Sequence, residues 1–138
     1  MAVDEDALKA QGWARLPMGN YSATIDPVFV SGEVGSRTLA MHTSPAMANH
    51  RPDTVHGGAL MTFADCALGF AAVEAIGAPR CATAQLNFQF VRGVPVGSVV
   101  TCRPELVRRT RRLLFLRGLF EVDGEVVGSA DAIFNAFE

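Results

Sequence analysis

The sequence predicts an α+β fold in which a curved antiparallel sheet wraps around one long central helix. Residues 54–72 form the longest apolar run of the chain, and the pair Gly57-Gly58 near its start is typical of a tight turn that leads into a buried helix. After Pro79 the sequence consists of short apolar segments divided by turn residues, which predicts a meander of strands. Short strands, one long helix and then four more strands favour a helix packed on an antiparallel sheet.

Length and composition fit a single domain that spans residues 1–138. The chain is 49% apolar and 19% charged, which allows a substantial core and is typical of a globular protein. The net charge of −2 gives no general attraction to nucleic acid, so we expect no nucleic-acid partner. No repeat, linker or low-complexity tract divides the sequence.

Turn residues divide the chain into the expected elements. Before the central helix we expect a short helix over 4–11, and a loop over 44–53. The early strands are expected over 13–17, 28–33 and 37–43. The central helix is expected over 57–76, ending at Gly77. The later strands are expected over 82–91, 98–107, 113–122 and 126–137, with turns at 92–97 and Asp123-Gly124.

The strand expected after the helix alternates between apolar and polar residues, which places them on opposite faces. One face would hold Ala82, Ala84, Leu86, Phe88 and Phe90. The polar face would hold Thr83, Gln85, Asn87 and Gln89.

The apolar run 54–72 carries one carboxylate, Asp65, in its middle. Because removing an unpaired carboxylate from water is costly, an acid in an apolar helix is paired, hydrogen-bonded or functional. The plain alternative to a function is a buried acid bonded to the backbone or to a neighbouring hydroxyl group.

His56, Gly57 and Gly58 lie where this helix begins. The first N–H groups of a helix have no partner within it, and the helix dipole favours negative charge beside them. Glycine also lets a carbonyl oxygen approach the backbone closely. This arrangement is that of an oxyanion hole for a thioester or ester, and the alternative is an ordinary tight turn.

The spacing of these two features predicts a homodimer. Asp65 lies eight residues beyond Gly57, which is about 12 Å along a helix. One carbonyl carbon cannot lie within reach of both groups of a single helix. If both act on one substrate, two helices run antiparallel across a two-fold axis, so that Gly57 of one protomer lies beside Asp65 of the other.

Other chemistry lacks its usual motifs. The chain has no G-x-S-x-G elbow, Walker loop, H-E-x-x-H or G-x-G-x-x-G sequence, and its three histidines lack metal-ligand spacing, so we expect no metal site. The scattered residues Cys66, Cys81 and Cys102 are typical of small buried side chains in a reducing compartment. An acidic N-terminus unlike a signal peptide, and acids within the apolar run, predict a cytoplasmic protein with no membrane partner.

Arginine is concentrated near the C-terminal third of the chain. Eleven of the twelve basic residues are arginines, and six of them fall between Arg103 and Arg117. The guanidinium group fits phosphate and carboxylate groups, so the cluster predicts contacts of that kind. The alternative is a strand edge that charge keeps from aggregating.

The segment 55–67, VHGGALMTFADCA, resembles the HGG-x(4)-L-A-D-x-A signature of hotdog-fold thioesterases of the phenylacetate-pathway (PaaI-like) type. Looser likenesses continue through 83–92 and 125–130, so the resemblance covers roughly residues 40 to 135. It implies a hotdog fold, assembled into homodimers and often into homotetramers that are dimers of dimers. It also implies hydrolysis of acyl-CoA thioesters with no metal or redox cofactor.

The resemblance also assigns roles by position. Asp65 would be the general base or nucleophile, the Gly57 N–H would bind the thioester oxygen, and His56 would help to orient the site. Thr83 matches a hydroxyl position that helps to place the attacking water. The residues expected to bind substrate are Asn49, His50, Val55, Gly58, Asn87, Phe88, Arg92, Arg109 and Arg111.

One position departs from the family pattern. The family usually has Asn six residues before the motif His, where this chain has His50, and Asn49 is one place away. Either residue can fill that role. In the family, basic residues near strand ends bind the phosphates of CoA. The arginines that fit this role here are Arg92, Arg108, Arg109, Arg111 and Arg112.

Two other functions share the expected fold. A hotdog dehydratase or hydratase pairs an acid with a catalytic His, and no His follows Gly57 in this chain. A non-catalytic protein that binds acyl-CoA or an aromatic ligand would show affinity without turnover. The apolar residues Met61, Phe63, Phe70, Phe88 and Phe90 can line an acyl pocket or form core, and aryl, short and medium acyl groups all remain open.

Overall fold

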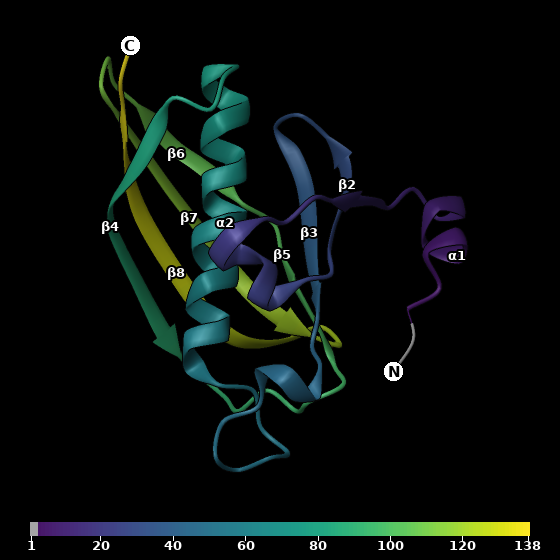
Figure 1. Ribbon diagram of the computed structural model, residues 1–138. Coiled ribbons are helices and arrows are strands. Elements are labelled where there is room, and N and C mark those ends of the chain that lie inside the picture. Colours follow the sequence, from purple (N-terminus) through teal and green to yellow (C-terminus); the bar gives the residue numbers. More distant parts are fainter. Residues whose placement is uncertain (1–2) are drawn as a thin grey trace.

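The computed structural model describes residues 3–138 and has the expected arrangement of one long helix enclosed by a curved antiparallel sheet (Figure 1). The helix, α2 (Gly57–Ile76), has the predicted bounds. The strands are β1 (Ala14–Leu16), β2 (Val28–Glu33), β3 (Ser36–His42), β4 (Cys81–Phe90), β5 (Val99–Cys102), β6 (Glu105–Arg109), β7 (Leu113–Val122) and β8 (Glu125–Ala136).

Between residue 3 and the start of α2 the structure has three short helical elements. The predicted N-terminal helix is present as α1 (Glu5–Ala10), capped by Asp4, whose carboxylate accepts a hydrogen bond from the Ala7 N–H. Two 3₁₀ helices, η1 (Asn20–Ile25) and η2 (Pro45–Met47), were not predicted. Helices of only one or two turns are too short to show a hydrophobic period.

Helix α2 supplies the centre of the core. Its buried residues follow a spacing of three and four and pack with residues of the sheet. They are Leu60, Phe63, Ala64, Ala67, Leu68 and Ala72. By length and mean hydropathy (1.6) α2 is also long and apolar enough to cross a membrane, but here it packs against the sheet of its own chain as a core helix does.

The strand order differs from the predicted meander. Among the described residues the order is β1-β2-β3-β5-β7-β8-β4, with β6 paired to β7. Strand β4 therefore pairs with the last strand of the chain, and β5 joins the two halves through β3. The predicted strand 98–107 is divided into β5 and β6 at Arg103-Pro104, since proline has no N–H to donate to a ladder.

A bulge in β4 corrects the predicted faces of that strand. Thr83 pairs with Phe134 of β8, but Gln85 pairs with the adjacent Ile133, so Ala84 is an extra residue in the ladder. A bulge of this kind reverses the alternation on one side of it. Leu86 and Phe88 do face the core, whereas Thr83, predicted on the opposite face, bonds to the helix.

Candidate active site

The N-terminus of α2 is capped by the side chain of His56. Its Nδ1 accepts a hydrogen bond of 2.7 Å from the Gly58 N–H, so the proton of the neutral ring lies on Nε2. A Cβ on Gly58 would lie 2.9 Å from Nδ1, which is too close for a side chain. Gly58 is therefore required by the histidine cap, and its N–H is occupied within the chain.

The cap leaves one donor of the first helical turn without a partner. The N–H groups of Ala59 and Leu60 both bond to the His56 carbonyl, at 3.0 and 3.3 Å. No hydrogen bond of the Gly57 N–H occurs within residues 3–138. A Cβ on Gly57 would lie 3.1 Å from Cε1 of Phe90, so this ring flanks the free N–H. Gly57 thus presents a backbone donor to a ligand, as an oxyanion hole would, and its catalytic role stays a prediction.

Asp65 lies farther along α2 and is half-buried. The Thr83 hydroxyl donates a hydrogen bond of 2.6 Å to its Oδ1, a contact that the bulge in β4 makes possible. No ion pair of Asp65 is found in the described part of the chain. The carboxylate therefore has a hydroxyl partner and no neutralising cation.

The second acid of α2 makes a useful contrast. Glu74 receives three hydrogen bonds of 2.8 to 3.2 Å from the guanidinium group of Arg37, on β3. The same guanidinium lies 5.9 Å from the centre of the Phe70 ring. Glu74 is thus satisfied as a structural ion pair that joins the helix to the sheet. Asp65 is the acid that this kind of pairing does not explain.

A cavity of about 550 Å³ lies beside Asp65, between α2 and η1. Its lining combines one side of the helix with an irregular segment before β2. The residues are Gly19, Asn20, Tyr21, Ser22, Gly58, Met61, Thr62, Asp65 and Cys66. Sequence reasoning missed residues 19–22 and Thr62, because this segment has no period; its one signal is that Tyr21 is the only tyrosine of the chain.

Cys66 also lines this cavity. Burial, together with the neighbouring Asp65 carboxylate, raises the pKa of the Cys66 thiol to about 11. The thiol is therefore protonated at neutral pH and is a poor nucleophile. The carboxylate is left as the basic group of the cavity.

The loop before α2 holds other predicted site residues. Asn49 Oδ1 accepts a hydrogen bond of 2.7 Å from the Arg51 N–H, and the Asn49 N–H donates to the Thr54 carbonyl, so Asn49 shapes the loop itself. His50 is exposed. Val55 is 3% exposed and belongs to the core, which leaves only its backbone to meet a ligand.

The remaining predicted ligands from β4 and its end lie in different settings. Phe88 is 8% exposed, and its ring lies 5.2 Å from that of Phe120, so it is mainly a core residue. Asn87 is exposed. Arg92 is exposed and forms an ion pair with Glu125.

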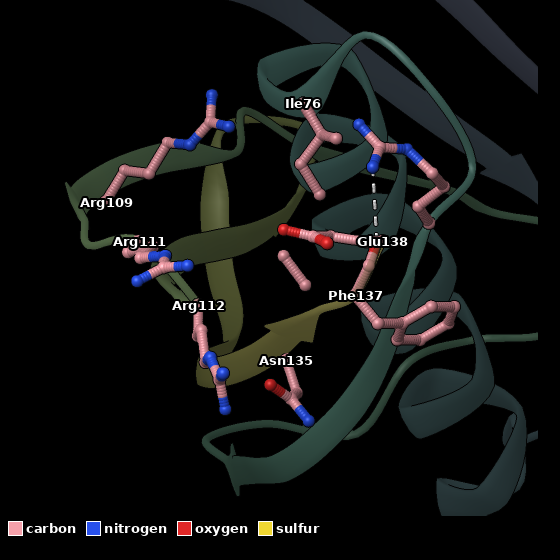
Figure 2. A pocket seen from close by; sticks show the side chains of 9 residues that line it. Ile76, Arg109, Arg111, Arg112, Asn135, Phe137 and Glu138 are labelled. Atoms are coloured by element: carbon pink, nitrogen blue, oxygen red, sulfur yellow. Dashed lines mark hydrogen bonds between the residues drawn. The ribbon is translucent and has the colours of Figure 1, made fainter.

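Arginines gather around a second cavity, of about 500 Å³, at the C-terminal end of α2 (Figure 2). Arg109 and Arg111 lie here with Arg80 and Arg112, and the Glu138 side chain points into the same space. Arg109 donates a hydrogen bond of 2.6 Å to the Ala75 carbonyl in the last turn of α2. Arg108 and Arg109 also lie on β6, which is exposed throughout. Part of the cluster therefore fits the alternative of a charged strand that resists aggregation.

The two parts of the predicted site do not converge within one chain. Gly57 and Asp65 lie on the same uninterrupted helix, about 12 Å apart along its axis. The arginine cavity begins at Ile76, about 16 Å beyond Asp65 in the other direction.

In the part of the chain that the structure describes, no group of three His, Cys, Asp or Glu side chains is arranged to hold a metal ion.

Comparison with known proteins identifies the family of the chain. Residues 53–129 match the family model of the thioesterase superfamily. The acyl-coenzyme A thioesterase THEM4 of Bos taurus is 36% identical over 80 residues, which are 58% of this chain and 32% of that protein. The match thus spans about a third of the length of this relative.

Solved structures share the fold. A phenylacetic acid degradation-related protein of Ralstonia eutropha has a TM-score of 0.76 at 23% identity, over 96% of this chain and 98% of that one. A thioesterase protein with coenzyme A from Streptococcus pneumoniae has a TM-score of 0.72 at 16% identity, over 83% and 89% of the two chains. The predicted hotdog architecture is therefore confirmed.

Proposed function

Because the chain belongs to the thioesterase superfamily, we propose that it hydrolyses acyl-CoA thioesters to a free acid and coenzyme A. The observation that carries this proposal is the Asp65 carboxylate beside an open cavity. It has a hydroxyl partner at 2.6 Å and no ion pair within residues 3–138. The relative THEM4 is named an acyl-coenzyme A thioesterase, which supports the choice of substrate class.

The proposed reaction uses each of the groups described above. A water molecule held by Asp65 and the Thr83 hydroxyl attacks the thioester carbonyl carbon, and Asp65 takes the proton of that water. The carbonyl oxygen gains the negative charge and is stabilised by the Gly57 N–H. When the carbonyl re-forms, the C–S bond breaks and the departing thiolate takes the proton from Asp65. Direct attack by Asp65 as a nucleophile is the alternative role for the same carboxylate.

A two-fold dimer is the second part of the proposal. Gly57 and Asp65 of one helix lie too far apart for both to contact the same thioester carbonyl group. Strand β4 supports it: this ten-residue strand lies at the end of the sheet order and pairs with β8 on one side. Phe90 is 55% exposed on it. A long edge strand with exposed apolar residues is prone to pair with another strand, and a second copy of β4 would continue the sheet.

The arginine cavity is proposed to bind the phosphates of CoA. It lies about 16 Å along α2 from Asp65, on the same protomer, and the pantetheine arm of CoA separates the thioester from the diphosphate by an extended chain. Arg111 lines the cavity, and its guanidinium group has no ion pair in the described residues.

Replacing Arg111 by glutamine is expected to raise KM for acyl-CoA about tenfold with little change in kcat, because one charge-assisted hydrogen bond to a phosphate is lost. The matched substrate is the same acyl group on pantetheine, which lacks the nucleotide phosphates and should show no change in KM. The control variant is Arg103→Gln, outside the cavity. An equal effect on both substrates would contradict the assignment.

Replacing Thr83 by alanine is expected to lower kcat about tenfold, since the loss of a hydrogen bond worth roughly 1.4 kcal/mol leaves Asp65 and its water less well placed. Thr83→Ser retains the hydroxyl and should keep most of the activity. Steady-state kinetics on both variants check this. Equal activity of the serine and alanine variants would show that the hydroxyl plays no part.

The function itself is tested by a hydrolysis screen over aryl, short-chain and medium-chain acyl-CoA substrates, with release of the free CoA thiol as the readout. Turnover that persists with a chelator present is expected, because the proposed reaction needs no metal. A protein that binds these esters without releasing thiol would be the non-catalytic alternative.

A further inference from the structure

The 3₁₀ helix η1 forms one wall of the cavity beside Asp65. In Figure 1 it is the indigo coil that crosses in front of α2. Tyr21 lies on this wall and is 72% exposed, although its neighbour Ile25 is 1% exposed in the core. The Tyr21 oxygen lies 3.5 Å from the Thr62 hydroxyl, one helical turn before Asp65.

The wall is held in place by its own backbone. Ile25 anchors one end of η1 in the core, and Asn20 adopts a left-handed conformation with φ of 55°, which asparagine tolerates better than most residues. The Ser22 hydroxyl donates to the Gly19 carbonyl at 2.9 Å. The exposure of Tyr21 is thus a consequence of a fixed segment that directs its ring outward, beside the helix.

The hydrogen bonds of this region leave the phenol available. Thr62 donates its hydroxyl proton to the Gly58 carbonyl at 2.8 Å, the usual bond of a threonine to the preceding turn. Tyr21 therefore keeps its own proton as a donor toward Thr62 or solvent. A large aromatic ring so exposed contributes little to the stability of the chain, so its replacement should leave the fold intact.

We propose that Tyr21 determines acyl specificity by narrowing, from the η1 wall, the cavity in which the acyl group lies, so that compact acyl groups are preferred. This rests on the proposed function only for the identity of the ligand as an acyl-CoA. With the thioester carbonyl at Asp65, the acyl group extends over Met61 and Thr62, and a longer chain meets the Tyr21 ring.

The test measures binding rather than turnover. S-alkyl-CoA thioethers, which cannot be hydrolysed, are titrated calorimetrically as a series of short to medium alkyl chains against the full chain and its Tyr21→Ala variant. Each methylene that the variant newly buries is expected to tighten binding about fourfold, so the medium-to-short affinity ratio should rise about tenfold or more. Tyr21→Phe keeps the ring and should keep the original ratio.

Val34→Ala is the matched control, since Val34 is an exposed apolar residue in the turn between β2 and β3 and lies outside the cavity. An unchanged ratio in Tyr21→Ala, or the same change in Tyr21→Phe, would overturn the proposal, as would a failure of the unmodified protein to bind any thioether. If the protein binds the series as expected but releases no thiol from acyl-CoA, the proposed hydrolysis fails while the role of Tyr21 stands.

Discussion

Replacing Asp65 by asparagine is expected to lower kcat for acyl-CoA hydrolysis by about 10³-fold or more, because the amide can neither take a proton from water nor attack the thioester. Fold and binding should be retained. The amide is nearly isosteric with the carboxylate, and its oxygen can still accept the hydrogen bond from Thr83. No ion pair is lost, since Asp65 has none in the described residues. Initial-rate kinetics measure the effect.

Two measurements distinguish a loss of catalysis from a loss of fold or of binding. Circular dichroism and the affinity for an S-alkyl-CoA thioether should be the same for Asp65→Asn and the unmodified protein. Asp6→Asn is the control variant, because Asp6 is an exposed acid on α1 and forms no ion pair in residues 3–138. Full activity of Asp65→Asn across the acyl-CoA panel would exclude this carboxylate as the catalytic group.

The helix and its two chemical features were predictable because each rests on local sequence. Apolar composition, the glycines at its start and Gly77 at its end define α2 over residues 57–76. The position of Gly57 and Asp65 on one helix then follows from helical geometry alone. The partner of Glu74 was not predictable, since Arg37 lies 37 residues earlier and only strand pairing brings it to the helix.

The contact between Thr83 and Asp65 could not be predicted from local sequence. Strict alternation places Thr83 and Leu86 on opposite faces of β4. A single extra residue at Ala84 reverses the alternation, so Thr83 can reach α2. The same holds for η1, because its position depends on the burial of Ile25 rather than on a pattern near Tyr21. The pairing of β4 with β8 is likewise set by how the whole sheet closes around α2. Long-range packing therefore supplied the finer geometry of the site.

Replacing Gly57 by proline is expected to lower kcat about 10²- to 10³-fold, because it removes the one N–H proposed to hold the oxyanion. Proline suits the first position of a helix, and His56 already has the extended conformation (φ −63°, ψ 136°) that a residue before proline adopts. Gly57→Ala is the matched variant. It adds a similar Cβ next to Phe90, an exposed ring able to shift, but keeps the N–H, so its loss should be much smaller.

Mixing the two inactive proteins then tests whether each site is shared between protomers. In a heterodimer of Asp65→Asn and Gly57→Pro, one site combines the intact Gly57 of the first protomer with the intact Asp65 of the second, and the other site carries both changes. Random exchange of protomers after mild unfolding and refolding should restore about a quarter of the unmodified activity from two inactive parents. Size-exclusion chromatography confirms the dimer in each sample. A mixture that stays inactive while heterodimers form, or an active monomer, would place both groups in one chain and refute the two-fold site.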